Sequence, residues 1–331
     1  MSGYQTIVFG CTGFIGSHVV EQLLRTCQHV TTPVRAGSDR AFLDSIGASP
    51  VALDFSRQDD IVDVIKGHAL VYCCLANPLH HLAPAELRAV EVELTGRVIA
   101  AAAQAGARRV VLLSTVMVYG FSRPPQPIDE DYPPAPTCAF NRVALEREIA
   151  AQAAAAQAGI ELVILRPANV LGRRDRQMSR LFAACRKGFF PVFGREEFRF
   201  SAVDARDVGR AMAFLGELAA AAGQTYLLKG FDTSWLELKS AFAKQSRKNL
   251  QVMRIPLFPA RLAGRILEML CPYGKEPLLS RFAVDVMSTH TLFDCGKIIA
   301  AGFAPKYSLE DSLGEILQAW DEDGRTGRLR A

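Results

Sequence analysis

Three glycines near the start of the chain have the spacing of a phosphate-binding turn. Gly10, Gly13 and Gly16 lie between a short apolar run, residues 6–9, and an amphipathic segment, residues 17–24. A strand that enters a helix through such a turn places backbone N–H groups and the positive end of the helix dipole against a pyrophosphate. The spacing therefore predicts a strand, a glycine turn and a helix that together bind a dinucleotide.

A basic residue stands where nucleotide-binding strands usually contact the ribose. Arg35 follows the next β-prone run, residues 29–34, about 20 residues past the glycines. A cofactor without a 2′-phosphate is usually met there by a carboxylate, whereas a guanidinium can hold a phosphate through two hydrogen bonds. The sequence therefore favours NADP(H). Asp39 lies close enough to keep NAD(H) open, and a solvated strand-end role for Arg35 is the structural alternative.

Short β-prone runs alternate with helical segments over the first half of the chain. Residues 85–105 have helical periodicity, and the alanine-rich run 150–158 ends at Gly159, a residue suited to terminating a helix. Such alternation predicts an α/β fold, a doubly wound parallel sheet covered by helices on both faces. The predicted strands are residues 6–9, 29–34, 51–53, 70–75, 110–114 and 161–165.

The regular alternation breaks after about residue 168, where proline-marked loops become frequent. We expect a dinucleotide-binding domain formed by residues 1–168 with parts of 200–230. Residues 169–331 would mainly form a smaller C-terminal substrate-binding domain over the carboxyl edge of the sheet. The crevice between the two is where ligands bind in this class of fold.

Bulk composition excludes several classes of function. Half of the 331 residues are apolar, the formal charge is +4, and basic residues are scattered rather than arranged in a stripe, which argues against nucleic-acid binding. The eight cysteines lack paired C-x-x-C spacing, so we predict no disulfide framework and no metal site. Reduced cysteines and the lack of a leader before the first strand fit a cytoplasmic protein.

One segment could contact a lipid surface, although no apolar stretch approaches the ~20 residues of a membrane span. Residues 257–270 are amphipathic at helical spacing. They could touch a membrane surface or a partner. A packed helix or a lid over the substrate pocket is the simpler interpretation.

Four later segments, in order along the chain, carry a family resemblance. Residues 110–120 end in Val-Tyr-Gly, and residues 165–172 contain Arg-Pro-Ala-Asn. Residues 203–208 read Val-Asp-Ala-Arg-Asp-Val, and the tail segment 290–309 begins with His-Thr-Leu-Phe-Asp. Together with the glycine turn they resemble the extended short-chain dehydrogenase/reductases. This is the NAD(P)-dependent epimerase/dehydratase family, and the nearest branch contains 3β-hydroxysteroid dehydrogenases and dihydroflavonol reductases. The resemblance covers nearly the whole chain.

The resemblance implies roles for individual residues. Thr115 would hold the substrate oxygen, and a homodimer is compatible with the family. The residues implied at the cofactor are Gly10, Thr12, Gly13, Phe14, Ile15, Gly16, Arg35, Asp54, Phe55, Arg142 and Pro167. The residues implied at the substrate are Asn77, Thr115 and Asn169.

The chain departs from the family at its catalytic pair, a Tyr-x-x-x-Lys in which the lysine lowers the tyrosine's pKa. Aligning Arg142 and Glu146 with the family's Lys-x-x-x-Glu places Cys138 at the tyrosine and Arg142 at the lysine. Cys74 likewise stands where a histidine is common, and Glu93 where an asparagine is usual. These changes suggest altered chemistry.

The substituted pair has two interpretations. Residues four apart share a helix face, so Arg142 could lower the pKa of Cys138 below the ~8.5 of a free thiol and create a base or nucleophile. Arginine stays charged and could hold a ribose but could not relay a proton. The alternative is an inert cysteine that fills the space of the tyrosine.

Other proton donors lie nearby in the sequence, each with a structural alternative. Tyr119 could donate a proton or could simply pack. His80 and His81 follow the fourth strand, at the edge of the sheet where sites form, although loop histidines are commonly solvated. Glu93 would be an acid or base only if it were buried in the pocket.

The sequence therefore predicts an NADP(H)-binding enzyme that transfers hydride to or from a secondary alcohol or ketone of a small, largely apolar substrate. Its proton would come from Cys138, Tyr119 or water. The alternative keeps the fold without net redox chemistry, as an isomerase, lyase or cyclase, or as a non-catalytic cofactor-binding protein.

Overall fold

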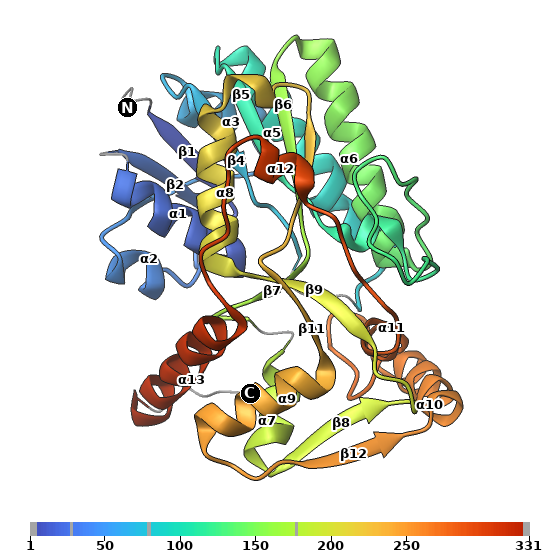
Figure 1. The fold of residues 1–331 in the computed structure, drawn as a ribbon. Coiled ribbons are helices and arrows are strands. Elements are labelled where there is room, and N and C mark those ends of the chain that lie inside the picture. The colour runs from blue at the N-terminus through green and yellow to red at the C-terminus, as the bar shows by residue number, and fades with distance from the viewer. Residues whose placement is uncertain (1–4, 27–28, 78–80, 176–177, 327–331) are drawn as a thin grey trace.

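The computed structural model describes residues 5–26, 29–77, 81–175 and 178–326 and centres on a sheet of seven parallel strands (Figure 1). The strand order is β10-β6-β5-β4-β1-β2-β3, so the chain winds outward from β1 in both directions. The predicted doubly wound α/β fold is confirmed. The strands are β1 (Thr6–Phe9), β2 (Val30–Val34), β3 (Ser49–Ala52), β4 (Leu70–Cys73), β5 (Arg109–Leu113), β6 (Glu161–Pro167) and β10 (Thr225–Leu228).

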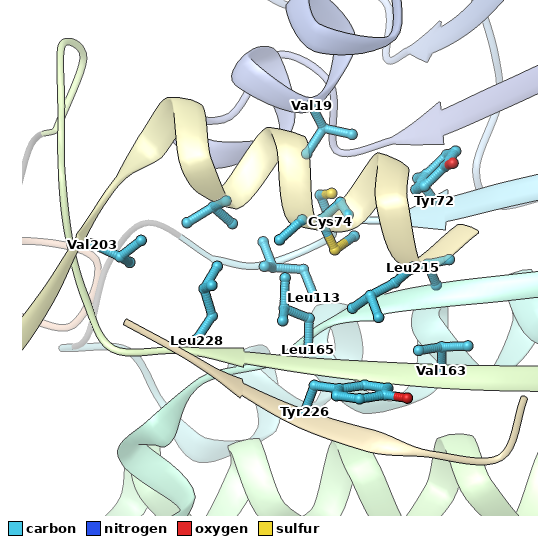
Figure 2. Packing of buried hydrophobic residues seen from close by; sticks show 14 of the residues in the cluster. Val19, Tyr72, Cys74, Leu113, Val163, Leu165, Val203, Leu215, Tyr226 and Leu228 are labelled. Carbon is cyan, nitrogen blue, oxygen red and sulfur yellow. The ribbon is translucent and has the colours of Figure 1, made fainter. Parts of the chain in front are cut away.

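Successive apolar residues of the central strands enter two separate cores. In β5, Val111 and Leu113 pack on one face of the sheet, and Val110 and Leu112 pack on the other. Figure 2 shows part of the first core. That core is covered by α1 (Phe14–Thr26) and α8 (Ala205–Glu217), and the second by α3 (Gln58–Ile65), α5 (Thr95–Gln104) and α6 (Ala139–Ala158).

One predicted helix is interrupted. The segment expected to be helical over residues 85–105 forms three consecutive pieces, of which the middle one is a π-helix. This wider turn changes which side chains face inward. The pieces are α4 (Pro84–Arg88), η1 (Ala89–Leu94) and α5.

Residues after 168 divide between the large sheet and a third core. Besides α8 and β10, the short helix α12 (Gly296–Ala300) packs against the large sheet through Ile298. The third core, in the lower half of Figure 1, is built around Phe182, Phe200 and Trp235. Its strands are β7 (Asn169–Leu171), β8 (Phe189–Phe193), β9 (Arg199–Asp204), β11 (Phe231–Ser234) and β12 (Gln251–Ile255). The helices of this half of the molecule are α7 (Ser179–Arg186), α9 (Trp235–Ser246), α10 (Leu257–Leu270), α11 (Arg281–Met287) and α13 (Leu309–Thr326).

A buried ion pair fastens α6 to the sheet. Glu148 of α6 is 2% exposed and accepts two parallel hydrogen bonds from Arg166 of β6, with Nη2 to Oε2 at 2.6 Å and Nε to Oε1 at 3.0 Å. Ser114 donates a further hydrogen bond to the same carboxylate. The pair therefore fixes the rotation of α6 and the position of its N-terminal end.

Removal of this carboxylate should destabilise the fold strongly. Glu148→Ala leaves the guanidinium of Arg166 buried without its charged partner, so we expect the free energy of unfolding to fall by about 3–5 kcal/mol in a denaturant titration. Glu146→Ala is the matched control, because Glu146 also pairs with an arginine, Arg88, but at the surface. Equal losses in the two variants would contradict the structural role of the buried pair.

Candidate active site

The glycine turn joins β1 to α1 through backbone contacts that exclude any side chain. Gly10 has φ of +78°, and a Cβ there would lie 2.3 Å from the carbonyl oxygen of Cys74. A Cβ on Gly16 would lie 2.2 Å from the carbonyl oxygen of Gly10. The turn is closed by a hydrogen bond from the Gly13 N–H to the Gly10 carbonyl at 3.0 Å. Glycine at positions 10 and 16 thus lets the helix begin directly against the strand end.

The geometry fits the diphosphate of a dinucleotide. Gly13 is exposed immediately before the first turn of α1, where backbone N–H groups lack partners within the helix. Phe14 and Ile15 begin that turn, and Thr12 is half-buried beside them. Cys11 does not contribute a nucleophile, because burial raises the pKa of its thiol to about 12.

A loop from the far half of the chain covers this turn. Arg174 donates from Nη2 to the carbonyl oxygen of Thr12 at 2.9 Å, and its guanidinium lies 4.4 Å from the ring centre of Phe42. The guanidinium of Arg173 lies 4.8 Å from the same ring centre. The buried imidazole of His18 hydrogen-bonds to the Arg173 carbonyl, and burial lowers the pKa of His18 to about 4. No sequence motif indicated that this loop lies over the glycine turn.

Three predicted cofactor residues lie at the ends of β2 and β3. Arg35 is exposed directly after β2. Nearby carboxylates are engaged by their own backbone: Asp39 accepts from the Ala41 N–H at 3.0 Å, and Asp54 accepts from the Ser56 N–H at 2.9 Å. The Ser56 hydroxyl also donates to Asp54, and these bonds lower the pKa of that carboxyl.

Phe55, in the loop after β3, is held in place from two directions. Its ring packs edge-on against Phe9 of β1 with 6.1 Å between ring centres. Its carbonyl accepts a hydrogen bond from Arg97 of α5 at 2.9 Å. The loop after β3 is therefore fixed beside the glycine turn.

The loop after β4 is positioned by a second buried ion pair. Glu91 of the π-helix accepts from Nη1 of Arg147 at 2.5 Å and from the Asn77 N–H at 2.8 Å, while Arg147 also donates to the Leu75 carbonyl. Glu93, which sequence analysis considered as an acid, is exposed instead. An acid or base role for Glu93 required burial, which Glu91 has and Glu93 lacks.

Cys74, at the end of β4, is buried, and burial raises the pKa of its thiol well above the usual range. His80 lies outside the described residues. His81 hydrogen-bonds through Nε2 to the Cys271 carbonyl at 3.0 Å, and the Gly274 N–H donates to the His81 carbonyl at the same distance. The imidazole of His81 therefore ties two loops together.

Thr115 and Tyr119 occupy opposite ends of the short 3₁₀ helix η2 (Val116–Tyr119). Thr115 caps this helix by accepting from the Met117 N–H at 3.2 Å, and its O–H remains able to donate. Tyr119 is fully buried; its hydroxyl donates to the Asp129 carbonyl and accepts from Arg166 at 2.7 Å. Burial raises the pKa of Tyr119 to about 12. These contacts favour packing over proton donation for Tyr119.

Cys138 occupies the N-cap position of α6, close to η2, without a capping hydrogen bond from its side chain. The segment before it packs on Gly120, where a Cβ would lie 2.0 Å from the Ala135 carbonyl oxygen. Burial raises the pKa of the Cys138 thiol; the N–H groups of Phe140 and Asn141 and the charge of Arg142 oppose this without reversing it. Arg142 does lower the pKa of the thiol, but the expected net pKa below that of a free thiol is wrong, because the cost of burying a thiolate outweighs the attraction.

Arg142 is exposed one turn further along α6. The carboxylate of Glu146, one more turn along, is held by Arg88 of α4 through two hydrogen bonds of 2.7 and 2.8 Å. The alignment on this Arg-x-x-x-Glu pattern remains a prediction from the resemblance.

The remaining predicted residues lie where β6 passes into β7. Pro167 is the buried last residue of β6. Asn169 donates from Nδ2 to the Ser201 carbonyl at 3.0 Å, which joins β7 to β9. Both residues lie where the chain passes from the seven-stranded sheet into the three-stranded sheet β11-β9-β7.

Comparison with known proteins decides the family. A model of the NAD dependent epimerase/dehydratase family matches residues 6–228. The chain belongs to this family. The match begins at the first residue of β1 and ends at the last residue of β10, so it contains the whole seven-stranded sheet.

Relatives of this epimerase/dehydratase protein have varied names. It is 22% identical to an N-acetyl-alpha-D-glucosaminyl-diphospho-ditrans,octacis-undecaprenol 4-epimerase of Escherichia coli O157:H7 over 94% of each chain. It is 25% identical to a 4-hydroxy-2-methyl-3-oxo-4-farnesyl-3,4-dihydroquinoline-1-oxide ketoreductase of Stigmatella aurantiaca, over 95% of this chain and 96% of the other. The shared family therefore does not fix the substrate.

Solved structures share the fold. The crystal structure of gox2253 superposes with a TM-score of 0.80 at 21% identity, covering 97% of this chain and 99% of that one. MoeE5 in complex with UDP-glucuronic acid and NAD superposes with a TM-score of 0.75 at 23% identity, covering 96% and 99%. Within the part of this family member that the structure describes, no helix is long and apolar enough to cross a membrane.

Proposed function

We propose that this family member transfers hydride between NADP(H) and a secondary alcohol or ketone of a small, largely apolar molecule, with Cys138 as proton donor in the reduction. The observation that carries the proposal is the position of the half-buried Cys138 thiol at the N-terminal end of α6, which packs against the helix that Thr115 caps. Thr115 follows the carboxyl end of β5, and the glycine turn follows the carboxyl end of β1, so both lie at the same edge of the parallel sheet.

The charges around the ribose position support NADP(H). Arg35 is exposed after β2, while the carboxylates of Asp39 and Asp54 are occupied by local hydrogen bonds. A 2′-phosphate there would meet the Arg35 guanidinium, while one oxygen of each of these two carboxylates is already bound to a backbone N–H. Gly10, Gly13 and Gly16 would hold the diphosphate, with Thr12, Phe14 and Ile15 completing the turn.

The raised pKa of Cys138 supports an acid rather than a base. When bound, NADPH supplies the hydride for the carbonyl carbon of the substrate. Thr115 would donate a hydrogen bond to the carbonyl oxygen, and the Cys138 thiol would transfer its proton to that oxygen as the alcohol forms. The thiolate left behind would be stabilised by the N-terminal end of α6 and reprotonated from solvent. Like a phenol, whose pKa is about 10, such a thiol is protonated at neutral pH.

An apolar substrate is supported by the rings near Cys138. Phe140 and Phe121 each pack edge-on against Phe282 of α11, with 5.5 and 5.6 Å between ring centres. The relative from Stigmatella is named as a ketoreductase of a farnesyl-bearing molecule. Asn77 and Asn169 would supply the polar contacts to the substrate, and Arg142 and Pro167 would lie on the cofactor side.

One observation favours the redox-silent alternative. Arg142, at the place of the family's lysine, is exposed rather than held against a neighbouring acid in the pocket. An isomerase, lyase or cyclase, or a non-catalytic cofactor-binding protein, would bind NADPH without consuming it.

Absorbance of the reduced nicotinamide, followed with a panel of cyclic and aryl ketones, separates hydride transfer from this redox-silent alternative. Oxidation of NADPH by at least one ketone is expected, and tight binding without turnover across the panel would overturn hydride transfer.

Substitution of Cys138 should affect the rate of reduction. Cys138→Ala removes the proton donor, so we expect kcat to fall by about 100-fold or more, with a smaller fall in Cys138→Ser. In the wild type kcat should decline only as pH rises beyond the ordinary thiol range of about 8.5, because only the protonated thiol donates and its pKa is raised. Cys271→Ala, which changes another half-buried thiol, is the control. Full activity in both Cys138 variants would assign this residue to packing.

Substitution of Arg35 should affect the choice of cofactor. Arg35→Ala removes the charged donors for the 2′-phosphate, so the Kd for NADPH should rise by about 10- to 100-fold while the Kd for NADH changes little. Fluorescence titration with each cofactor measures both values. Arg25→Ala, at the other end of α1, should leave both unchanged. Equal losses of NADPH and NADH affinity in Arg35→Ala would remove the argument for a bound phosphate.

A further inference from the structure

A stripe of large apolar side chains is exposed along α10 and the segment that follows it. These side chains are between 48% and 86% exposed. Five lie on α10, each three or four residues from another member, so they share one broad face of the helix. We call this set the α10 stripe; its members are Phe258, Leu262, Ile266, Met269, Leu270, Tyr273 and Leu278.

The opposite face of α10 is packed. Ala260 and Gly264 are buried, and a Cβ on Gly264 would lie 2.9 Å from the Arg281 N–H nitrogen at the start of α11. Leu257 packs with Val284 of α11 in a small core of the same region. The helix is therefore anchored to the protein by one face and leaves the α10 stripe exposed at the outer edge of the lower half of the molecule (Figure 1).

Basic residues border the stripe. Arg261 and Arg265 are exposed on α10, each three residues after a member of the stripe. Residues 251–281 contain five arginine or lysine residues against two glutamates, a surplus of three positive charges. One of those glutamates, Glu268, accepts a hydrogen bond from the Arg281 N–H, and Asp285 of α11 pairs with Arg261.

This combination fits a membrane better than a second copy of the chain. A two-fold contact between two α10 stripes would place their basic borders close to each other, where like charges repel. An in-plane amphipathic helix buries its apolar face among lipid chains while basic side chains reach anionic headgroups. We propose that the α10 stripe docks this protein on the surface of membranes that contain anionic lipid.

The stripe is joined to the candidate substrate side of the site. Tyr273 stacks on His81 with 5.1 Å between ring centres, and His81 lies in the loop after β4 that also contains Asn77. Phe282, at the start of α11, contacts Phe140 two residues after Cys138. Docking would therefore place this end of the site next to the lipid surface. The proposal does not depend on hydride transfer.

Vesicle sedimentation tests the proposal. Vesicles of phosphatidylcholine with phosphatidylglycerol should sediment the wild-type protein, and vesicles of phosphatidylcholine alone should bind it much less. The double variant Phe258→Ser/Met269→Ser should bind the mixed vesicles at least about tenfold more weakly, because two exposed side chains no longer enter the lipid. Arg265→Glu should also weaken binding, and added salt should reduce wild-type binding.

Ile299→Ser, which removes an exposed apolar side chain from α12, should bind like the wild type. Thermal unfolding and NADPH titration of each variant establish that the fold and the cofactor site are intact, so a failed membrane result is distinct from a failed cofactor site. Equal vesicle binding by the wild type and the double variant, or none by either, would overturn the proposal. The proposal would also be overturned if light scattering found that the wild type is a dimer and the double variant a monomer.

Discussion

The site depends on the close approach of backbone at Gly10 and Gly16. Any Cβ at these positions would overlap carbonyl oxygens of the strand end or of the turn itself, at 2.2–2.3 Å. The same helix is pressed against α8, where a Cβ on Gly209 would lie 2.6 Å from the His18 carbonyl oxygen. These three glycines therefore fix the position of α1 between the sheet and α8, and with it the direction in which the N-terminal end of α1 points.

The rest of the site is assembled on that frame by two buried ion pairs. Glu148 with Arg166 sets the N-terminal end of α6, and Glu91 with Arg147 sets the loop after β4. Both pairs include a residue of α6. Removal of either member of a pair would leave the other member charged and buried. Cys138 is therefore held by the same framework whatever chemistry it performs.

The fold could be predicted because its signals are local. Apolar strands whose successive residues serve two cores, and glycines at a strand end, are visible in the sequence. The burial of Glu91 could not be predicted, because a π-helix changes which side chains face inward and no sequence pattern marked one here. The family pattern drew attention to Glu93, which is exposed.

Two other features depend on contacts that the sequence does not contain. Arg174 reaches Thr12 from 162 residues away, and no local pattern signals that return. The four-residue spacing of Cys138 and Arg142 suggested an activated thiol, but the pKa depends more on burial than on that neighbour.

The most direct test of the account is calorimetric titration of NADPH into the wild type and into Gly13→Asp. Aspartate is favoured at the position before a helix, and its Cβ would lie 3.2 Å from the Gly10 carbonyl oxygen, so the thermal midpoint of the variant is measured first. Its charge would stand where the diphosphate is expected. The account predicts binding to the wild type and none to the variant. Equal binding to both proteins, or no binding to a folded wild type, would contradict it.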